Sequence, residues 1–462
     1  MLDRETVSAV LERALSRGAD FAEVFVEDSR KFSLSYVDRM AKQLTRGRDR
    51  GAGVRVFYED RAVYAHTTNL DADNLLDVAT SVAAAGGNGT AGALKALNDA
   101  RASEIITVLE PPSSGGTADF LDLARRADES ARAVDAAIVQ VSAGMSWSER
   151  SLLIANSEGV HATEDRSYMM ARLEVVASEN GQQQTATERH GCRTGLAEFN
   201  EFDPESRGRE TAERALRMVR APHAPAGNMP VVIGNAFGGV IFHEACGHSL
   251  ETTAVAKGSS VFAGKLGEKV AAECVTAVDD GTRENEWGTT AIDDEGTPTQ
   301  KTVLIENGVL KSYMVDRMGS VMTGEELTGS GRRESYRVAP TSRMRNTYID
   351  AGSDNFEDMV ASTERGLYAR EMGGGSVNPA TGEFNFSVVE GYLIENGRIG
   401  GPVRGASLIG FGHEILQRIE MVGSDLKLET GTCGSISGWV PTTVGQPSIK
   451  VSEITVGGRS RS

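Results

Sequence analysis

Residues 228–251 read NMPVVIGNAFGGVIFHEACGHSLE, which predicts a short buried strand followed directly by a helix. The strand is expected over residues 228–234 and the helix over residues 236–250, with Asn235 as its N-cap. The apolar run just before the first histidine indicates that this helix is buried. His243 and His248 are therefore either core histidines with structural partners or ligands of a metal ion.

The spacing of the two histidines constrains how they could bind one ion. Imidazoles are natural zinc ligands, and Glu244, beside His243, is placed to activate a metal-bound water. On a regular helix, residues five apart diverge by roughly 140°. His243 and His248 can therefore share an ion only if the helix contains a π-type bulge or ends inside the motif. Gly247 would permit either distortion.

A zinc site also needs a third protein ligand. Glu251 follows His248 by three residues, so one helical turn could return it to the ion. Cys433 lies far downstream between glycines, which allow close approach to a metal. Cys246 is expected to project elsewhere, and spacing does not choose between Glu251 and Cys433. More distant candidates, in ordinary surroundings, are Cys192, Cys274 and His413.

Residues 242–251 resemble the signature of the TldD/PmbA family of metallopeptidases, in its metal-bearing TldD branch. The resemblance runs over essentially the whole chain and implies that His243, His248 and Cys433 bind zinc, with Glu244 as general base. After Cys433 and Gly434, residues 435–438 read SISG, where the family often has a lysine and a glutamine. This difference keeps Cys433 as a ligand but affects the expected substrate contacts around it. Further segments resemble the family's sequences and occur in the same order along the chain, at residues 292–300, 331–337, 345–348, 431–434 and 445–447.

The resemblance implies a zinc-dependent peptidase that hydrolyses peptide bonds of small unfolded proteins or precursor peptides. It also implies a dimer, with a PmbA-type partner or with a second copy of this chain, and a hidden active site. Two other functions are a non-catalytic partner or assembly subunit and a thiol-based redox protein using Cys246 with Cys433. The joint presence of the histidines, Glu244 and Cys433 disfavours the first, and the lack of a Cys-x-x-Cys pair disfavours the second.

Composition narrows the class of protein further. A chain of 462 residues is expected to form two or more domains. The net charge of −17 disfavours nucleic acid as a partner, and four scattered cysteines do not make a disulfide framework. No signal region or apolar run of about 20 residues is seen, so we expect a cytoplasmic protein with no membrane segment.

Hydrophobic periodicity predicts an α+β fold. An N-terminal domain, residues 1–222, is expected to be an α/β region with mainly antiparallel sheet, with subdomains at about 1–97 and 117–222 as an alternative. Residues 221–227, rich in proline and glycine, form the boundary. A C-terminal domain, residues 228–462, is expected to be dominated by antiparallel sheet and to carry the metal-site helix. Helices are expected over residues 5–17, 70–85, 119–134 and 204–220.

Two Asn-Gly pairs, at residues 307–308 and 396–397, predict tight β-hairpins because both residues tolerate positive φ angles. The glycines at 373–375 are expected in a loop.

A cluster of arginines suggests a place for substrate. Arg332, Arg333 and Arg337 are candidates to bind the C-terminal carboxylate or the carbonyl groups of a peptide. The alternative is structural pairing with the abundant Asp and Glu. For the acidic residues 293–295, a turn with capping or salt-bridging carboxylates is favoured over a calcium site, because no regular ligand spacing follows.

Overall fold

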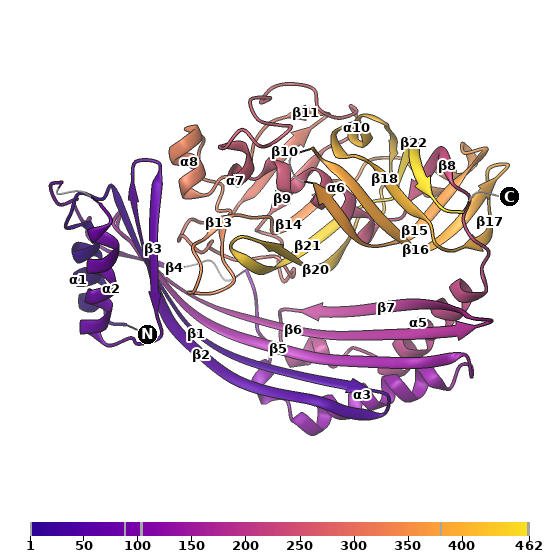
Figure 1. Ribbon diagram of the computed structural model, residues 1–462, viewed down its shortest axis with the longest axis horizontal. Helices are drawn as coiled ribbons and strands as arrows, with labels where there is room; N and C mark the ends of the chain where they lie inside the picture. The colour runs from indigo at the N-terminus through magenta and orange to yellow at the C-terminus, as the bar shows by residue number, and fades with distance from the viewer. Residues whose placement is uncertain (1, 87–88, 102–104, 379–380, 460–462) are drawn as a thin grey trace.

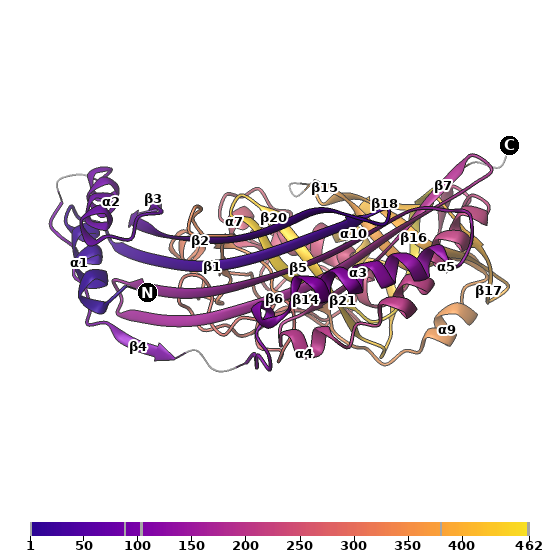
Figure 2. The same ribbon diagram turned by 90° about the horizontal axis from the view of Figure 1, so that it is seen from below.

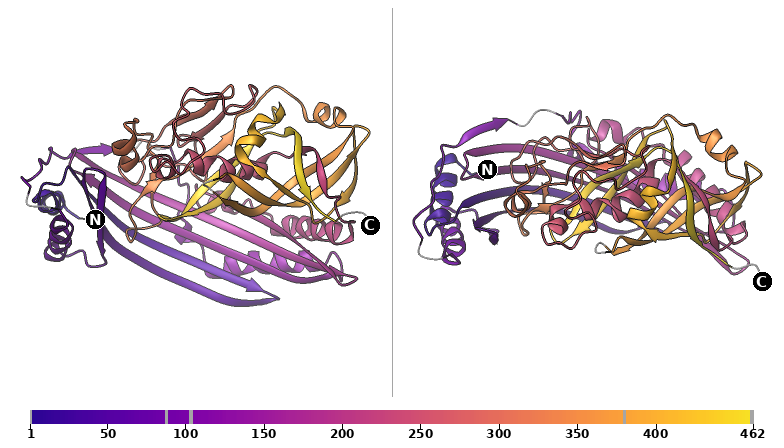
Figure 3. Two further views of the ribbon diagram at one scale, coloured as in Figure 1. Left: turned by 45° about the horizontal axis from the view of Figure 1, so that its top comes forward. Right: turned by 90° about the horizontal axis from the view of Figure 1, so that it is seen from above.

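The computed structural model describes residues 2–86, 89–101, 105–378 and 381–459. A long, curved sheet lies beneath a larger, β-rich C-terminal body, and the two termini lie toward opposite ends of the molecule (Figure 1). Seen from below, helices α3 (Thr117–Arg132) and α5 (Pro204–Arg220) cover the outer face of the sheet (Figure 2). Seen from above, the C-terminal body covers the part of the sheet farther from the first two helices (Figure 3). This α+β architecture agrees with the predicted fold class.

The N-terminal sheet has the strand order β3-β2-β1-β5-β6, and both β4 and β7 pair with β6. Neighbours are antiparallel except β4 and β6. One continuous sheet thus includes strands from both ranges that the sequence offered as subdomains. Its strands are β1 (Phe21–Val37), β2 (Met40–Tyr58), β3 (Arg61–Thr67), β4 (Asn98–Arg101), β5 (Ile138–Asn156), β6 (Val160–Glu179) and β7 (Gln182–Cys192).

The N-terminal helices agree with the periodicity of the sequence. Asp3 accepts a hydrogen bond from the Thr6 backbone N–H at 2.8 Å and so caps the first helix. Asp203 caps the last one, where Pro204 occupies the first turn. The helices are α1 (Arg4–Leu15), α2 (Ala72–Ala84), α3 (Thr117–Arg132), α4 (Leu196–Phe199) and α5 (Pro204–Arg220), with a 3-10 turn at Pro112–Ser114.

The C-terminal body contains two larger sheets and one short ribbon. The first sheet has the order β11-β10-β9-β14-β21-β20, and the second has the order β15-β8-β22-β18-β16-β17 with β19 on β22. Most pairs are antiparallel, as predicted, but β14 with β21 and β8 with β15 are parallel. The strands are β8 (Gly227–Ile233), β9 (Ala277–Asp280), β10 (Lys301–Glu306), β11 (Val309–Leu310), β12 (Gly331–Arg332), β13 (Thr341–Ser342), β14 (Asn346–Ile349), β15 (Arg365–Asn378), β16 (Glu383–Glu395), β17 (Arg398–Val403), β18 (Ser407–Phe411), β19 (Ile419–Val422), β20 (Lys427–Ser435), β21 (Gly438–Gln446) and β22 (Ile449–Gly457).

Both predicted Asn-Gly hairpins are confirmed. Asn307 and Asn396 have φ angles of 48° and 54°, and the glycine after each is also positive, as a two-residue hairpin turn requires. The expected loop at residues 373–375 is wrong, because these glycines lie within β15. Gly375 pairs with Phe386 of β16, and the register shift between Met372 and Gly375 makes a bulge that contains the other two glycines. The remaining C-terminal helices are α6 (Val240–Ala245), α7 (Thr252–Val255), α8 (Arg317–Thr323), α9 (Phe356–Ala361) and α10 (Gly412–Gln417).

A buried set of charged side chains joins the N-terminal sheet to the C-terminal body. Arg55 on β2 donates to both Glu23 and Glu295 at 2.6 Å, and Arg166 on β6 donates to Asp294 at 2.6 Å. Arg333 donates to Glu23. All six side chains are essentially excluded from solvent. The acidic segment 293–295 therefore forms a turn with salt-bridging carboxylates, as predicted.

Candidate metal centre

The predicted helix over residues 236–250 is divided into three short pieces. A 3-10 turn at Ala236–Gly239 leads into α6, which ends at Ala245, and a second 3-10 turn covers Gly247–Leu250. Cys246 between them has φ −126° and ψ −46°, outside the helical range. The helix thus ends inside the motif, which is one of the two distortions that the histidine spacing required.

Two residues around this break act differently from expectation. Asn235 occupies the N-cap position, but its side chain donates to Asp425 and caps nothing. Gly247 is needed for space, since a Cβ atom there would lie 2.3 Å from the Met344 sulfur.

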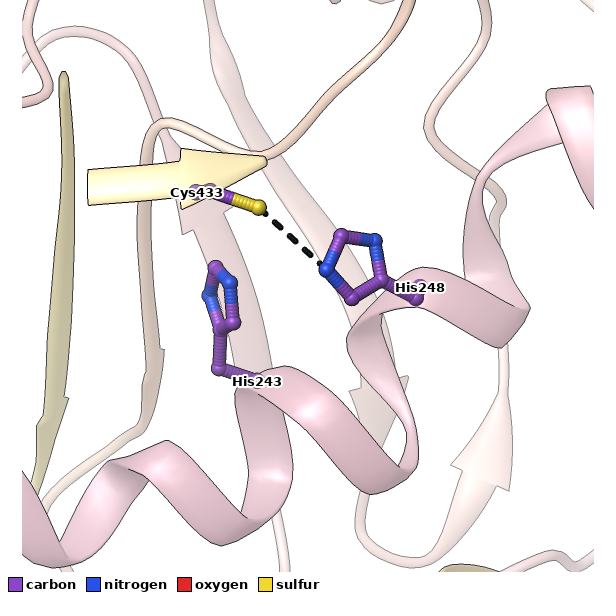
Figure 4. Close-up of side chains that lie close together, drawn as sticks. All are labelled: His243, His248 and Cys433. Atoms are coloured by element: carbon purple, nitrogen blue, oxygen red, sulfur yellow. Dashed lines mark hydrogen bonds between the residues drawn. The ribbon is translucent and has the colours of Figure 1, made fainter. Parts of the chain in front are cut away.

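His243, His248 and Cys433 converge on one point (Figure 4). One ligand atom from each lies within 4.8 Å of the other two. The Cys433 sulfur on β20 is 3.2 Å from Nε2 of His248. The centres of the two imidazole rings are 5.2 Å apart, and the ring planes make an angle of 80°. Two ligands of one tetrahedral zinc ion are roughly 3.6 Å apart. The Cys433 sulfur and Nε2 of His248 are therefore about as close as two ligands of a shared ion, and the donor of His243 lies within 4.8 Å of both.

Electrostatics favour a thiolate at Cys433. Burial raises the pKa of this thiol, but His243 and His248 lower it by more, to about 3. Burial lowers the pKa of His248, whereas Glu251 and Cys433 raise it well above its ordinary value. A thiolate is the form of cysteine that binds metal ions.

Two carboxylates flank His248 in different ways. Glu251 accepts from Nδ1 of His248 at 3.1 Å, on the side of the ring away from Cys433. This is the position of a carboxylate that orients a metal-binding imidazole, so Glu251 is a neighbour of the ligand set. Glu244 lies 3.7 Å from Nε2 of His248, is about one-third exposed, and lines a cavity.

That cavity has a volume of about 380 Å³ and contains His243 and Glu244 in its wall. A second cavity of about 410 Å³ adjoins it, since both are lined by Arg189, Phe237 and Gly374. Part of the lining comes from β6 and β7 of the N-terminal sheet. The sequence showed no signal for these residues, because only the docking of that sheet against the C-terminal body brings them to the site.

The arginines predicted to bind substrate lie elsewhere. Arg332 is buried and donates to the carbonyl groups of Met344 and Pro441. Arg333 pairs with Glu23, and Arg337 pairs with Asp49. None of the three lines either cavity within the described part of the chain, and their contacts match the structural alternative. A substrate role for them has no support in this geometry.

The other cysteines and His413 also lie outside the ligand cluster in the residues described. Cys246 is buried against apolar side chains, and burial raises the pKa of its thiol, which opposes a reactive role. No helix of the described chain combines the length and apolar character needed to cross a bilayer.

The chain is similar to known proteins along its whole length. Residues 22–86, 110–219 and 226–458 match domain 1, the central domain and the C-terminal domain of the PmbA/TldA metallopeptidases. A metalloprotease TldD homolog of Haemophilus influenzae is 38% identical over 99% of this chain and 97% of its own. A zinc metalloprotease TldD homolog of Saccharolobus solfataricus is 30% identical over 66% of this chain and 68% of its own.

Solved structures show the same fold. A Thermotoga maritima protein superposes with a TM-score of 0.81 at 23% identity, covering 98% of this chain and 99% of its own. TldE from Thermococcus kodakarensis gives a TM-score of 0.76 at 21% identity, covering 98% of this chain and 100% of its own. With three domain models matched in order and a close relative over its full length, this chain belongs to the PmbA/TldD family and is a metallopeptidase.

Proposed function

We propose that this chain is a zinc-dependent peptidase that cleaves small unfolded proteins or precursor peptides. The observation that carries the proposal is the convergence of His243, His248 and Cys433 beside Glu244. The donor set fits zinc, which prefers imidazole nitrogen and thiolate sulfur and in catalytic sites takes three protein ligands. In addition, Nδ1 of His243 is buried without a hydrogen-bond partner among the described residues, which is costly unless a ligand satisfies the ring.

His243, His248 and Cys433 would hold the ion, which when bound lowers the pKa of water and polarises a carbonyl group. Glu244 would accept a proton from the attacking water on its carboxylate and later deliver that proton to the departing amine. Glu251 keeps His248 in place by accepting from Nδ1, which leaves Nε2 directed at the site. Glu244 suits the general-base role because it lines the cavity, whereas Glu251 is buried.

Burial of the site supports unfolded substrates. His243 and Cys433 are each only 3% exposed, and the cavity beside them is walled by both halves of the chain. A folded protein could not bring a peptide bond to these atoms, whereas an extended segment could enter the cavity.

The general-base role is tested with Glu244→Gln in the purified, zinc-loaded chain. Cleavage of unstructured peptides, followed by mass spectrometry, should fall by about 10²–10⁴-fold while zinc content is unchanged. Full activity in this variant would remove Glu244 from the mechanism.

The ligand set is tested with two buried cysteines of the same chain. Cys433→Ser should lose zinc, measured by elemental analysis, because the thiolate ligand is gone. Cys246→Ser is the matched control and should retain it, since Cys246 lies outside the ligand cluster. Zinc retained by Cys433→Ser and lost by Glu251→Gln would show that the third ligand is assigned wrongly.

We also propose that the chain works in the cytoplasm as a dimer, with a PmbA-type subunit or with itself. This proposal rests on membership of the PmbA/TldD family, because the resemblance to that family implies a dimer. Light scattering on the purified chain should give twice the monomer mass of 49.2 kDa for a homodimer. A monomer that shifts to a heterodimer only when a PmbA-type chain is added would identify the other arrangement.

A further inference from the structure

Two arginines face each other across neighbouring strands beside the metal centre. Arg172 on β6 and Arg189 on β7 are directly paired in the antiparallel register, so their side chains share one face of the sheet. Both line the cavity that contains His243 and Glu244. Like charges directly opposite each other on a sheet are unfavourable. The fold therefore bears a local electrostatic cost at the wall of its own candidate active site.

Nearby carboxylates do not neutralise this pair fully. Arg172 is bridged to Glu174 at 3.2 Å, but Arg189 has no ion pair within 4.0 Å among the described residues. Its guanidinium instead lies 5.7 Å from the centre of the Phe237 ring. Burial lowers the pKa of Arg189 and Arg172 lowers it further, whereas the more distant carboxylates of Glu429 and Glu371 raise it without reversing the shift. Arg189 is thus a half-buried cation with no carboxylate at ion-pair distance in the part of the chain that the structure describes.

The other arginines near this cavity have close carboxylate partners, so the lack of an ion pair distinguishes Arg189 from them. In the second cavity Arg214 bridges Glu371 at 2.6 Å, and Arg370 bridges Glu390 at 3.0 Å. Arg189 lines the same cavity, but no described carboxylate forms an ion pair with it. Because Arg189 also lines the first cavity, it lies where the two cavities meet.

We propose that Arg189, assisted by Arg172, binds a carboxylate of the peptide substrate and makes this site selective for anionic peptides. A guanidinium matches a carboxylate in two parallel hydrogen bonds, and an anion here would offset the repulsion between the two arginines. The carboxylate is either the C-terminal α-carboxylate or an acidic side chain. The inference rests on the proposed function in that the bound anion belongs to the peptide being cleaved.

Binding is tested with the full-length, zinc-loaded Glu244→Gln chain and three fluorescent, unstructured peptides built on one parent sequence. The first has a free C-terminus and no acidic residue, the second is its C-terminal amide, and the third is the amide with one added glutamate. By fluorescence anisotropy, a carboxylate should tighten binding about ten-fold relative to the neutral amide. Preference for the first peptide identifies the α-carboxylate, and preference for the third identifies a side chain.

The arginine is tested by substitution in the same background. Arg189→Gln should bind all three peptides like the neutral amide, and Arg189→Lys should retain part of the preference, because it keeps the charge and loses the planar fork. Arg209→Gln, a change of the same charge at an exposed position on α5, should keep the full preference. Equal binding of the three peptides by the Glu244→Gln parent would overturn the inference, as would an unchanged preference in Arg189→Gln.

Cleavage of the same peptides by the chain with Glu244 intact separates this inference from the proposed function. Selective binding without any cleavage would refute the peptidase mechanism and leave the carboxylate site standing. Equal cleavage and equal binding of all three would support the peptidase and refute the site.

Discussion

Replacement of Arg333 by methionine should destabilise the protein strongly. The Arg333 side chain is fully buried and pairs with Glu23, and it also donates to the Asp294 carbonyl at 2.9 Å. Its guanidinium lies 4.3 Å from the centre of the Phe25 ring. Methionine fills similar space but leaves a buried carboxylate short of one partner, a change that costs about 3–5 kcal/mol. Because Arg55 still bridges Glu23, we expect the free energy of unfolding to fall by about 3 kcal/mol, at the lower end of that range.

Arg337 supplies a control within the same sequence segment. It pairs with Asp49, but its side chain is 45% exposed, so Arg337→Met should cost at most about 1 kcal/mol. Urea unfolding of both variants, followed by tryptophan fluorescence and circular dichroism, measures the difference. If Arg333→Met shifts the urea midpoint no more than Arg337→Met does, the buried charges do not hold the two halves of the chain together.

Three further changes have defined outcomes. Glu251→Ala should weaken zinc affinity about 10–100-fold in competition with a chelator, and unchanged affinity would deny it an orienting role. Gly239→Ala places a Cβ atom 2.4 Å from the Gly445 carbonyl oxygen and should cost about 1–3 kcal/mol of stability, whereas Gly47→Ala meets nothing within 4 Å and should be nearly neutral. Burial raises the pKa of Glu371 to about 7, so its contribution to stability is full below pH 4.5 and lost as pH rises through 7. Glu371→Gln should therefore show a smaller fall in melting temperature from pH 5 to pH 8 than the unsubstituted chain, and an equal fall would contradict the assignment.

The proposed cysteine ligand illustrates how the candidate metal centre joins local and distant parts of the chain. Cys433 and His248 are 185 residues apart, yet their side chains lie 3.2 Å apart. The strand β20 that carries Cys433 is held in place by β21, which is itself paired with β14. Ligand geometry in this protein therefore depends on sheet pairing as much as on the histidine motif.

Local patterns in the sequence were sufficient for several features. The apolar periodicity of α1 and α5 predicted both helices, and the Asn-Gly pairs predicted both hairpins, because neighbouring residues alone decide those conformations. The five-residue spacing of His243 and His248 predicted that a helix must be distorted if they share an ion. The end of α6 at Ala245 provides that distortion.

Other features were decided only when distant segments packed together. Spacing alone left Glu251 and Cys433 equal as third ligands, and the fold placed Cys433 beside Nε2 of His248 and Glu251 beside Nδ1. It also turned Arg333 inward to Glu23 and brought Arg189 to the cavity wall. A side chain's partners depend on which sheets meet. In this protein the N-terminal sheet docks on the C-terminal body through contacts that no short stretch of sequence contains.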